Sequence, residues 1–246
     1  MQREAALRYA SELAAHSARN AAVPLQQGLE AARTLAATLG ALKTSGNANR
    51  QAGHAILRTV LEQNPRFVGV WTGWEPNAFD ERDSDFADMA GHDATGRYVP
   101  YWNRGGANGS SALDPLTDYE KPGAGDYYQL PKSTGKATLL EPYAYQIGGK
   151  SVLITTLSVP IVIEGRFVGV AGVDITLDGI QDIVQAIRIY ENGYASLLSN
   201  QSIYVAAKDR SKIGKPADTS DGLSKRSIAN PAYCRAWRAE CGIVGK

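Results

Sequence analysis

Two carboxylates with tyrosines between them are the residues whose types suggest chemistry most directly. Asp126 stands in a glycine-rich stretch, and Asp174 ends an apolar segment. Carboxylates bind ammonium and N–H groups, and aromatic faces attract cations. We therefore expect a small site with acidic ends and aromatic walls, suited to a small, positively charged or N–H-rich organic molecule. The tyrosines expected in its walls are Tyr127, Tyr128, Tyr143 and Tyr145.

Further aromatic side chains stand at the ends of expected strands. Trp71 and Trp74 flank the end of one strand, and Trp102 ends another, next to Tyr101. We expect one of these tryptophans to form a wall of the site and the others to belong to the core, with Tyr101 as a further candidate for the site.

Each acidic candidate also has a purely structural interpretation. Asp174 precedes an expected helix and could cap it, although Thr176 is better placed as the N-cap. Asp126 could form hydrogen bonds within its own turn, as aspartate often does. If the segment around residue 127 is extended, Tyr127 and Tyr128 point to opposite sides, so that one of them lines the site.

The sequence contains no recognisable catalytic or metal-binding motif. We find no nucleophile elbow or P-loop, and His16, His54 and His92 lack the spacing of metal ligands. The Asp80–Asp88 loop lacks the ligand pattern of a calcium loop, so we expect it to be solvated and to pair with Arg104. The sequence therefore predicts a binding domain that is not an enzyme and uses no cofactor or metal.

Composition limits the class of protein further. The 246 residues carry a net charge of +1, which gives no electrostatic footprint for nucleic acid. No run of about 18 apolar residues could span a bilayer. The cysteines Cys234 and Cys241 would lie about 10.5 Å apart in one helix, beyond disulfide reach, so a bridge requires a break between them.

The pattern of elements predicts an α+β fold. Apolar residues spaced by three and four predict helices over 3–43 and 49–64. Strands are expected over 67–71, 97–102, 137–145, 151–160 and 166–174, and the last three form an antiparallel meander with turns at Gly148-Gly149 and Glu164-Gly165. A helix over 177–187 and a hairpin over 194–207 would begin a second, smaller module.

Several motifs follow one another along the chain. They are Trp71-x-x-Trp74-Glu75-Pro76-Asn77, Gly96-Arg97-Tyr98-Val99-Pro100-Tyr101-Trp102, Gly125-Asp126-Tyr127-Tyr128-x-x-Pro131-Lys132, Glu141-Pro142-Tyr143 and Gly169-Val170-x-Gly172-Val173-Asp174-Ile175. With the long helix, they resemble the double Cache sensor domain of bacterial methyl-accepting chemotaxis receptors. The likeness covers about residues 3–216.

The resemblance implies a periplasmic sensor domain of an inner-membrane protein. Two PAS-like modules on antiparallel sheets would lie against the long helix. We expect the helix over 1–46, the membrane-distal, ligand-binding module over 47–187, and an incomplete membrane-proximal module over 188–246. The parent is expected to be a chemoreceptor that forms a homodimer through the N-terminal helix and does not bind nucleic acid. A sensor histidine kinase or a diguanylate cyclase is the alternative parent.

The resemblance also bears on the ligand. Amino-acid-binding members carry an arginine just before the aromatic pair, which clamps the ligand carboxylate. Here those positions read Gly125-Asp126. The resemblance therefore implies an amine, quaternary ammonium or purine ligand, with its ammonium or N–H group on Asp174. An amino-acid or organic-acid sensor of the same fold is the alternative.

Overall fold

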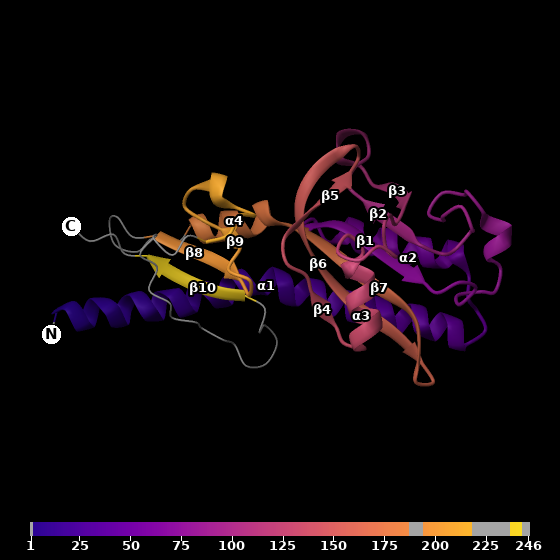
Figure 1. The fold of residues 1–246 in the computed structure, drawn as a ribbon, viewed down its shortest axis with the longest axis horizontal. Coiled ribbons are helices and arrows are strands. Elements are labelled where there is room, and N and C mark those ends of the chain that lie inside the picture. The colour runs from indigo at the N-terminus through magenta and orange to yellow at the C-terminus, as the bar shows by residue number, and fades with distance from the viewer. Residues whose placement is uncertain (1, 187–193, 218–236, 243–246) are drawn as a thin grey trace. The chain divides into compact units, whose positions relative to one another are not determined.

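The two helices expected in the N-terminal part of the chain are α1 (Gln2–Thr44) and α2 (Arg50–Gln63). Asn49 caps α2, since its side chain accepts a hydrogen bond from the backbone N–H of Ala52. The computed structural model describes residues 2–186, 194–217 and 237–242 (Figure 1). Within these ranges the fold is α+β with antiparallel sheets, as predicted.

The chain divides into two compact units. The larger unit comprises Gln27–Leu140 and Ala144–Ile175, and the smaller unit comprises Met1–Gln26, Glu141–Tyr143 and Thr176–Lys246. Among the described residues, each unit contains one sheet. All the residues that gather around Asp174 belong to the larger unit.

A seven-stranded sheet forms the centre of the larger unit. Its strand order is β3-β2-β1-β7-β6-β4, and β5 pairs with β6. The turns at Gly148-Gly149 and Glu164-Gly165 have positive φ at both residues, which suits tight hairpins. The strands are β1 (Phe67–Trp74), β2 (Pro100–Asn103), β3 (Ala112–Pro115), β4 (Thr138–Leu139), β5 (Tyr143–Ile147), β6 (Lys150–Ile163) and β7 (Arg166–Thr176).

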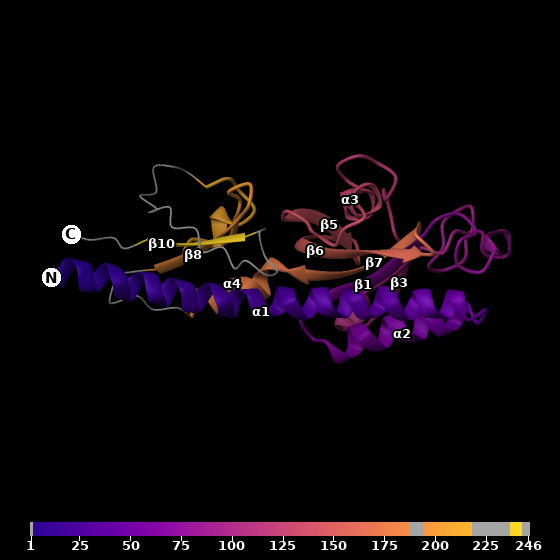
Figure 2. The same cartoon turned by 90° about the horizontal axis from the view of Figure 1, so that it is seen from below.

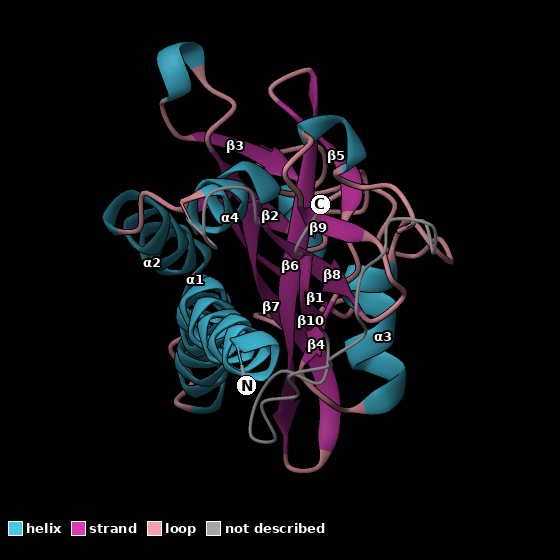
Figure 3. Cartoon of the chain, turned by 90° about the vertical axis from the view of Figure 1, so that its left-hand side faces the viewer, coloured by secondary structure: helices cyan, strands magenta, loops and turns pink. Residues whose placement is uncertain are grey.

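Helices cover both faces of this sheet. Residues 27–44 of α1 lie with α2 on one face, and α3 (Asp126–Thr134) lies on the other (Figures 2 and 3). Gly28 allows α1 to approach the sheet, because a Cβ there would lie 2.9 Å from a methyl carbon of Leu157. Leu35 and Leu39 of α1 and Leu57 of α2 are buried in this layer.

Three expectations about the elements need correction. Residues 126–134 form a helix, whereas we expected a glycine-rich turn at Asp126, so the alternation that applied if Tyr127 and Tyr128 were extended does not hold. The strand expected over 137–145 is divided into β4 and β5 around Pro142, which lacks a backbone N–H donor. Strand β3 was not predicted, because its sequence Ala-Leu-Asp-Pro has no clear alternation.

The acidic loop is also different from the expectation. Asp80 and Asp83 form ion pairs with Arg50 of α2, at 2.7 Å and 2.6 Å, and Arg50 also donates to the carbonyl of Gly96. Asp83 and Arg50 are buried. This part of the loop therefore anchors α2. Short 3₁₀ turns occur within the loop at Asp83–Phe86 and elsewhere in the chain at Ala107–Gly109 and Arg210–Lys212.

The smaller unit contains α4 (Leu177–Gln185) and a three-stranded sheet of order β10-β8-β9, with β8 (Tyr194–Ser199), β9 (Tyr204–Ala206) and β10 (Trp237–Gly242). Thr176 is the N-cap residue of α4, but its side chain makes no capping hydrogen bond. Cys241 lies on the strand β10 and so not in a helix, and Cys234 lies outside the described residues. Among the described residues, no helix combines the length and apolar character needed to cross a bilayer.

Candidate functional site

Asp174 is a fully buried carboxylate at the centre of the larger unit's sheet. It lies on β7, where it pairs in register with Gly69 of β1. Its Oδ1 atom accepts hydrogen bonds from Trp71 Nε1 at 3.2 Å and from Thr156 Oγ1 at 2.7 Å. The hydroxyl of Tyr101 also interacts with this carboxylate and acts to lower its pKa. All these donors are neutral groups.

Four aromatic rings stand around this carboxylate. Trp71 and Tyr101 are direct cross-strand partners on β1 and β2. The ring of Tyr127, from α3, lies edge-to-face with Trp71 at 5.2 Å and near Tyr145 of β5 at 6.1 Å between centroids. Tyr145 also lies 5.5 Å from Tyr101. We call Asp174 and these four rings the aromatic box.

Two glycines leave the space that the box occupies. A Cβ at Gly172 would lie 2.1 Å from the indole of Trp71, so the indole packs directly against the backbone of β7 at Gly172. A Cβ at Gly69 would lie 2.4 Å from the ring of Tyr101 and 2.6 Å from Asp174 Oδ2. Any larger residue at either position would displace part of the box.

Burial controls the electrostatics of the box. Loss of hydration raises the pKa of Asp174 to about 6, although the hydrogen bonds from Thr156, Trp71 and Tyr101 oppose this rise. Burial also raises the pKa of Tyr145, and the nearby charge of Asp174 adds to that effect. None of the ion pairs formed by the described residues involves Asp174. The carboxylate therefore lacks a positive partner within this part of the chain.

The other sequence candidates lie elsewhere. Asp126 begins α3, and its carboxylate accepts from the backbone N–H of Gly123 at 2.9 Å, which is the local role that the sequence also allowed. Tyr128 bonds with Glu75 and Arg97 outside the box. Trp102 lies on the opposite side of β2 from Tyr101, since its ring packs near residues of α2. Tyr143 is half-buried and belongs to the smaller unit.

The structure adds one residue that the sequence did not indicate. Thr156 donates to Asp174 from the middle of the apolar strand β6. The sequence signal for it is the threonine pair Thr155-Thr156 in a run of aliphatic residues, and the structure buries both side chains. Arg104 does not pair with the acidic loop as expected; it donates to the backbone carbonyls of Phe67, Leu61 and Asn64.

Two histidines distant in sequence also lie together. The rings of His54 and His92 are 5.8 Å apart, on the α2 side of the sheet beside Tyr98 and Trp102. Burial lowers the pKa of His54 to about 4. Burial also lowers the pKa of His92, so both rings are uncharged at neutral pH. The described residues contain no group of three or more potential metal ligands.

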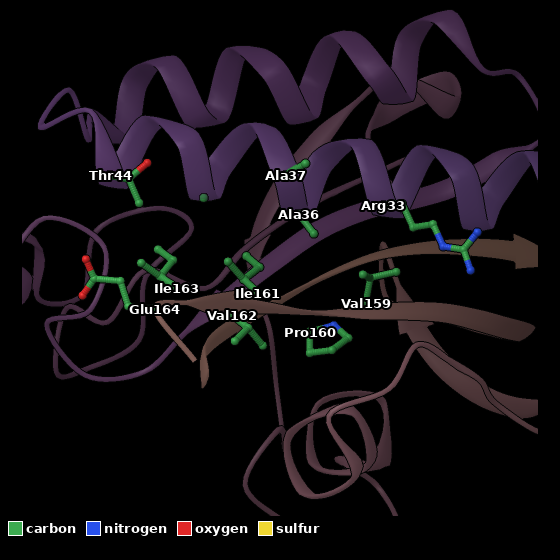
Figure 4. A pocket seen from close by; sticks show the side chains of 11 residues that line it. Arg33, Ala36, Ala37, Thr44, Val159, Pro160, Ile161, Val162, Ile163 and Glu164 are labelled. Carbon is green, nitrogen blue, oxygen red and sulfur yellow. The ribbon is translucent and has the colours of Figure 1, made fainter. Parts of the chain in front are cut away.

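A surface groove lies apart from the box. It has a volume of about 510 Å³ and runs between α1 and the C-terminal part of β6, with Arg33 near one end and Glu164 near the other (Figure 4). Its walls are small or aliphatic side chains, including Ala36 and Ile161. None of the residues predicted from the sequence lines it, and it has no side chain suited to bind an ammonium group beyond Glu164.

Comparisons with known proteins agree with this architecture. The family described as methyl-accepting chemotaxis protein-like, first PDC sensor domain, matches residues 54–182. The methyl-accepting chemotaxis protein TlpQ of Pseudomonas aeruginosa is 28% identical over 179 residues, which cover 67% of this chain and 25% of TlpQ. The chain thus spans about a quarter of that relative.

Solved structures give the same result. The chain is 37% identical to the extracellular domain of a protein described as a histidine kinase, mmHK1S-Z2, with a TM-score of 0.76 and coverage of 85% of this chain and 75% of that one. It is 25% identical to methyl-accepting chemotaxis protein X, with a TM-score of 0.77 and coverage of 94% and 96%. The double Cache resemblance and the extracytoplasmic location are therefore confirmed, and the chain belongs to the family of methyl-accepting chemotaxis protein-like PDC sensor domains.

Proposed function

We propose that this sensor domain binds a small nitrogenous organic molecule in the aromatic box, with an ammonium or N–H group on Asp174. The observation that carries the proposal is a fully buried carboxylate that receives hydrogen bonds only from neutral donors. A carboxylate has about four lone-pair positions, so the donors in place leave room for one more. A cationic or N–H-rich ligand would supply the missing partner.

The aromatic rings favour amines, quaternary ammonium compounds and purines over other nitrogenous molecules. Ring faces attract cations, and they also stack against flat heterocycles. The two ligand types therefore remain alternatives within one proposal.

The α-amino-acid alternative requires a cation for the ligand carboxylate. Arg104 donates to backbone carbonyls, and Arg97 pairs with Glu75 and Glu120. If either arginine bound the carboxylate of an amino-acid ligand, it would have to leave its present partners. This cost supports an amine or a purine as the preferred ligand class.

The parent protein is proposed to be a membrane-anchored chemoreceptor. Ligand binding would shift the population of two packings of the domain and pass the change toward the membrane. A homodimer through α1 is part of this proposal. The alternative parent is a sensor kinase, which the 37% identity to the histidine kinase ectodomain supports; a diguanylate cyclase stays a second alternative.

A thermal-shift screen tests the proposal directly. The panel contains amines, quaternary ammonium compounds, purines, amino acids and organic acids. A ligand at 100 times its dissociation constant stabilises a protein by about 2.7 kcal/mol. We expect hits among amines or purines, and loss of those hits in Asp174→Asn.

The matched control is Asp182→Asn, which removes an exposed carboxylate paired with Arg210. It should leave every hit unchanged. Hits confined to amino acids or organic acids, or amine and purine hits that survive in Asp174→Asn, would refute the proposed site.

A further inference from the structure

The two adjacent tyrosines of α3 serve different surroundings. Tyr127 contributes its ring to the aromatic box, and its hydroxyl donates to the carbonyl of Thr117. Tyr128 lies outside the box, although it follows directly in sequence. Hydrogen bonds and contacts that hold Tyr128 therefore also fix the first turn of the helix that carries Tyr127.

Helix α3 depends on such tertiary contacts for its stability. It has only nine residues, and helices of this length are marginal without tertiary contacts. The residue before it is Gly125, which has no side chain to cap the helix. Its position must come from the side chains that pack and bond along it.

Four side chains supply these bonds on the side away from the box. The Tyr128 hydroxyl donates to Glu75 Oε1 at 2.5 Å and accepts from Arg97 Nη2 at 2.8 Å. One turn later, Lys132 Nζ lies 2.9 Å from both oxygens of Glu75. We call Glu75, Arg97, Tyr128 and Lys132 the Glu75 clamp.

The clamp ties α3 to β1. Glu75 directly follows Trp74, the last residue of β1, and the side chain of Arg97 donates to the carbonyl of Trp74. Arg97 is buried and reaches Glu120 as well, at 2.6 Å. Strand β1 also carries Trp71. The clamp therefore joins the element that presents Tyr127 to the strand that presents Trp71.

We infer that the Glu75 clamp positions Tyr127 against Trp71 and so sets the width of the aromatic box. Its four members are positioning residues that do not themselves contact the box. The inference rests on the proposed function where it concerns ligands. Where it concerns the spacing of the two rings, it stands on the ligand-free structure alone.

The first test measures the chemical shift of the Trp71 indole N–H by NMR spectroscopy in ligand-free protein. The Trp71 ring lies edge-to-face with Tyr127, so ring currents make this resonance sensitive to the position of Tyr127. Trp71→Phe assigns the resonance, and Tyr127→Leu gives its position without the neighbouring ring. In Tyr128→Phe and in Lys132→Met we expect the resonance to move toward its Tyr127→Leu position.

The control is Tyr98→Phe, which removes another buried phenol with one hydrogen bond, to the carbonyl of Arg50. It should lower stability but leave the Trp71 resonance in place. An unchanged resonance in both clamp variants would overturn the inference, even if their stability falls. Lys132 is partly exposed, so Lys132→Met keeps the test valid if Tyr128→Phe does not fold.

The second test measures binding of tetramethylammonium by calorimetry. Loss of the clamp bonds made by Tyr128 or by Lys132 should weaken binding about tenfold in the corresponding variant, and Tyr98→Phe should bind as wild type does. Equal binding by wild type and clamp variants would contradict the role of the clamp in ligand affinity. A wild-type domain that does not bind the probe counts against a cationic ligand in the proposed function, and the resonance test still decides the clamp.

Discussion

Asp174 connects binding with stability at the scale of one residue. A buried carboxylate is held by hydrogen bonds from Trp71 and Thr156, but loss of hydration still favours its neutral form. The folded protein therefore binds a proton at Asp174 more readily than the unfolded chain does. A group arranged in this way reduces the stability of the ligand-free domain at neutral pH.

The pH dependence of stability should reveal this reduction. The pKa of Asp174 rises from 3.8 to about 6 on folding, so its contribution is most favourable below pH 3.8 and is lost as the pH rises through 6. The unfolding free energy of wild type, measured against Asp174→Asn by urea titration, should fall by about 2–3 kcal/mol between pH 4 and pH 7. Parallel curves for the two proteins would contradict this prediction.

The glycines around Asp174 are required by geometry. Gly172→Ala would place a methyl group 2.1 Å from the Trp71 indole, so the indole must move. Overpacking of this kind destabilises a core by about 1–3 kcal/mol, and ligand stabilisation should disappear with it. Denaturant unfolding and the thermal-shift screen measure the two effects.

Gly179→Ala provides the matched control. Gly179 lies within α4, and a Cβ there meets no atom within 4 Å. Alanine is the better helix former, so this variant should gain up to about 1 kcal/mol and keep every ligand hit. Equal effects of the two substitutions would argue against a special role for Gly172.

At the scale of elements, helix α2 depends on one arginine. Arg50 bonds with Asp80, Asp83 and the carbonyl of Gly96, and only 3% of its side chain is exposed. The three partners come from a long connection between β1 and β2. This ion-pair network therefore fixes the connection to the helix.

Removing this arginine should be costly. Arg50→Met leaves two carboxylates largely buried without their partner, and loss of one member of a buried ion pair typically costs about 3–5 kcal/mol. Arg58→Met is the control, because the Arg58–Glu62 pair is about half exposed and such pairs contribute less than about 1 kcal/mol. Urea unfolding of both variants measures the difference, and similar losses would refute the anchoring role.

At the scale of the whole molecule, ligand binding and protonation compete at Asp174. A quaternary ammonium ligand binds the ionised carboxylate, so its affinity should be constant above pH 7 and should fall about tenfold per pH unit well below pH 6. A neutral purine does not require the charge and should show a weaker dependence. Calorimetry between pH 5 and pH 8 separates the two ligand types, and a quaternary ligand with no pH dependence would contradict the role of Asp174.

Much of the larger unit could be predicted from the sequence. The helices and long strands have strong apolar periodicity, and the Gly148-Gly149 and Glu164-Gly165 turns were found with their positive φ angles. Asp174 was identified as a candidate because it ends an apolar segment where Thr176 is the better-placed cap, and because it closes the glycine motif on which the family resemblance rests. These signals are local, and each can be read within a short stretch of sequence.

The tertiary structure decided which candidates meet. The sequence indicated nine candidates, and the fold brings five of them together. Four rings, Trp71, Tyr101, Tyr127 and Tyr145, surround the buried carboxylate of Asp174, whereas Asp126, Tyr128, Tyr143 and Trp102 lie elsewhere. Strand register separated Tyr101 from Trp102, and the helical form of α3 turned Tyr128 toward Glu75. Thr156 and the partners of Arg50 also come from distant segments. Such choices depend on long-range pairing and burial, which the residue types permit but do not specify.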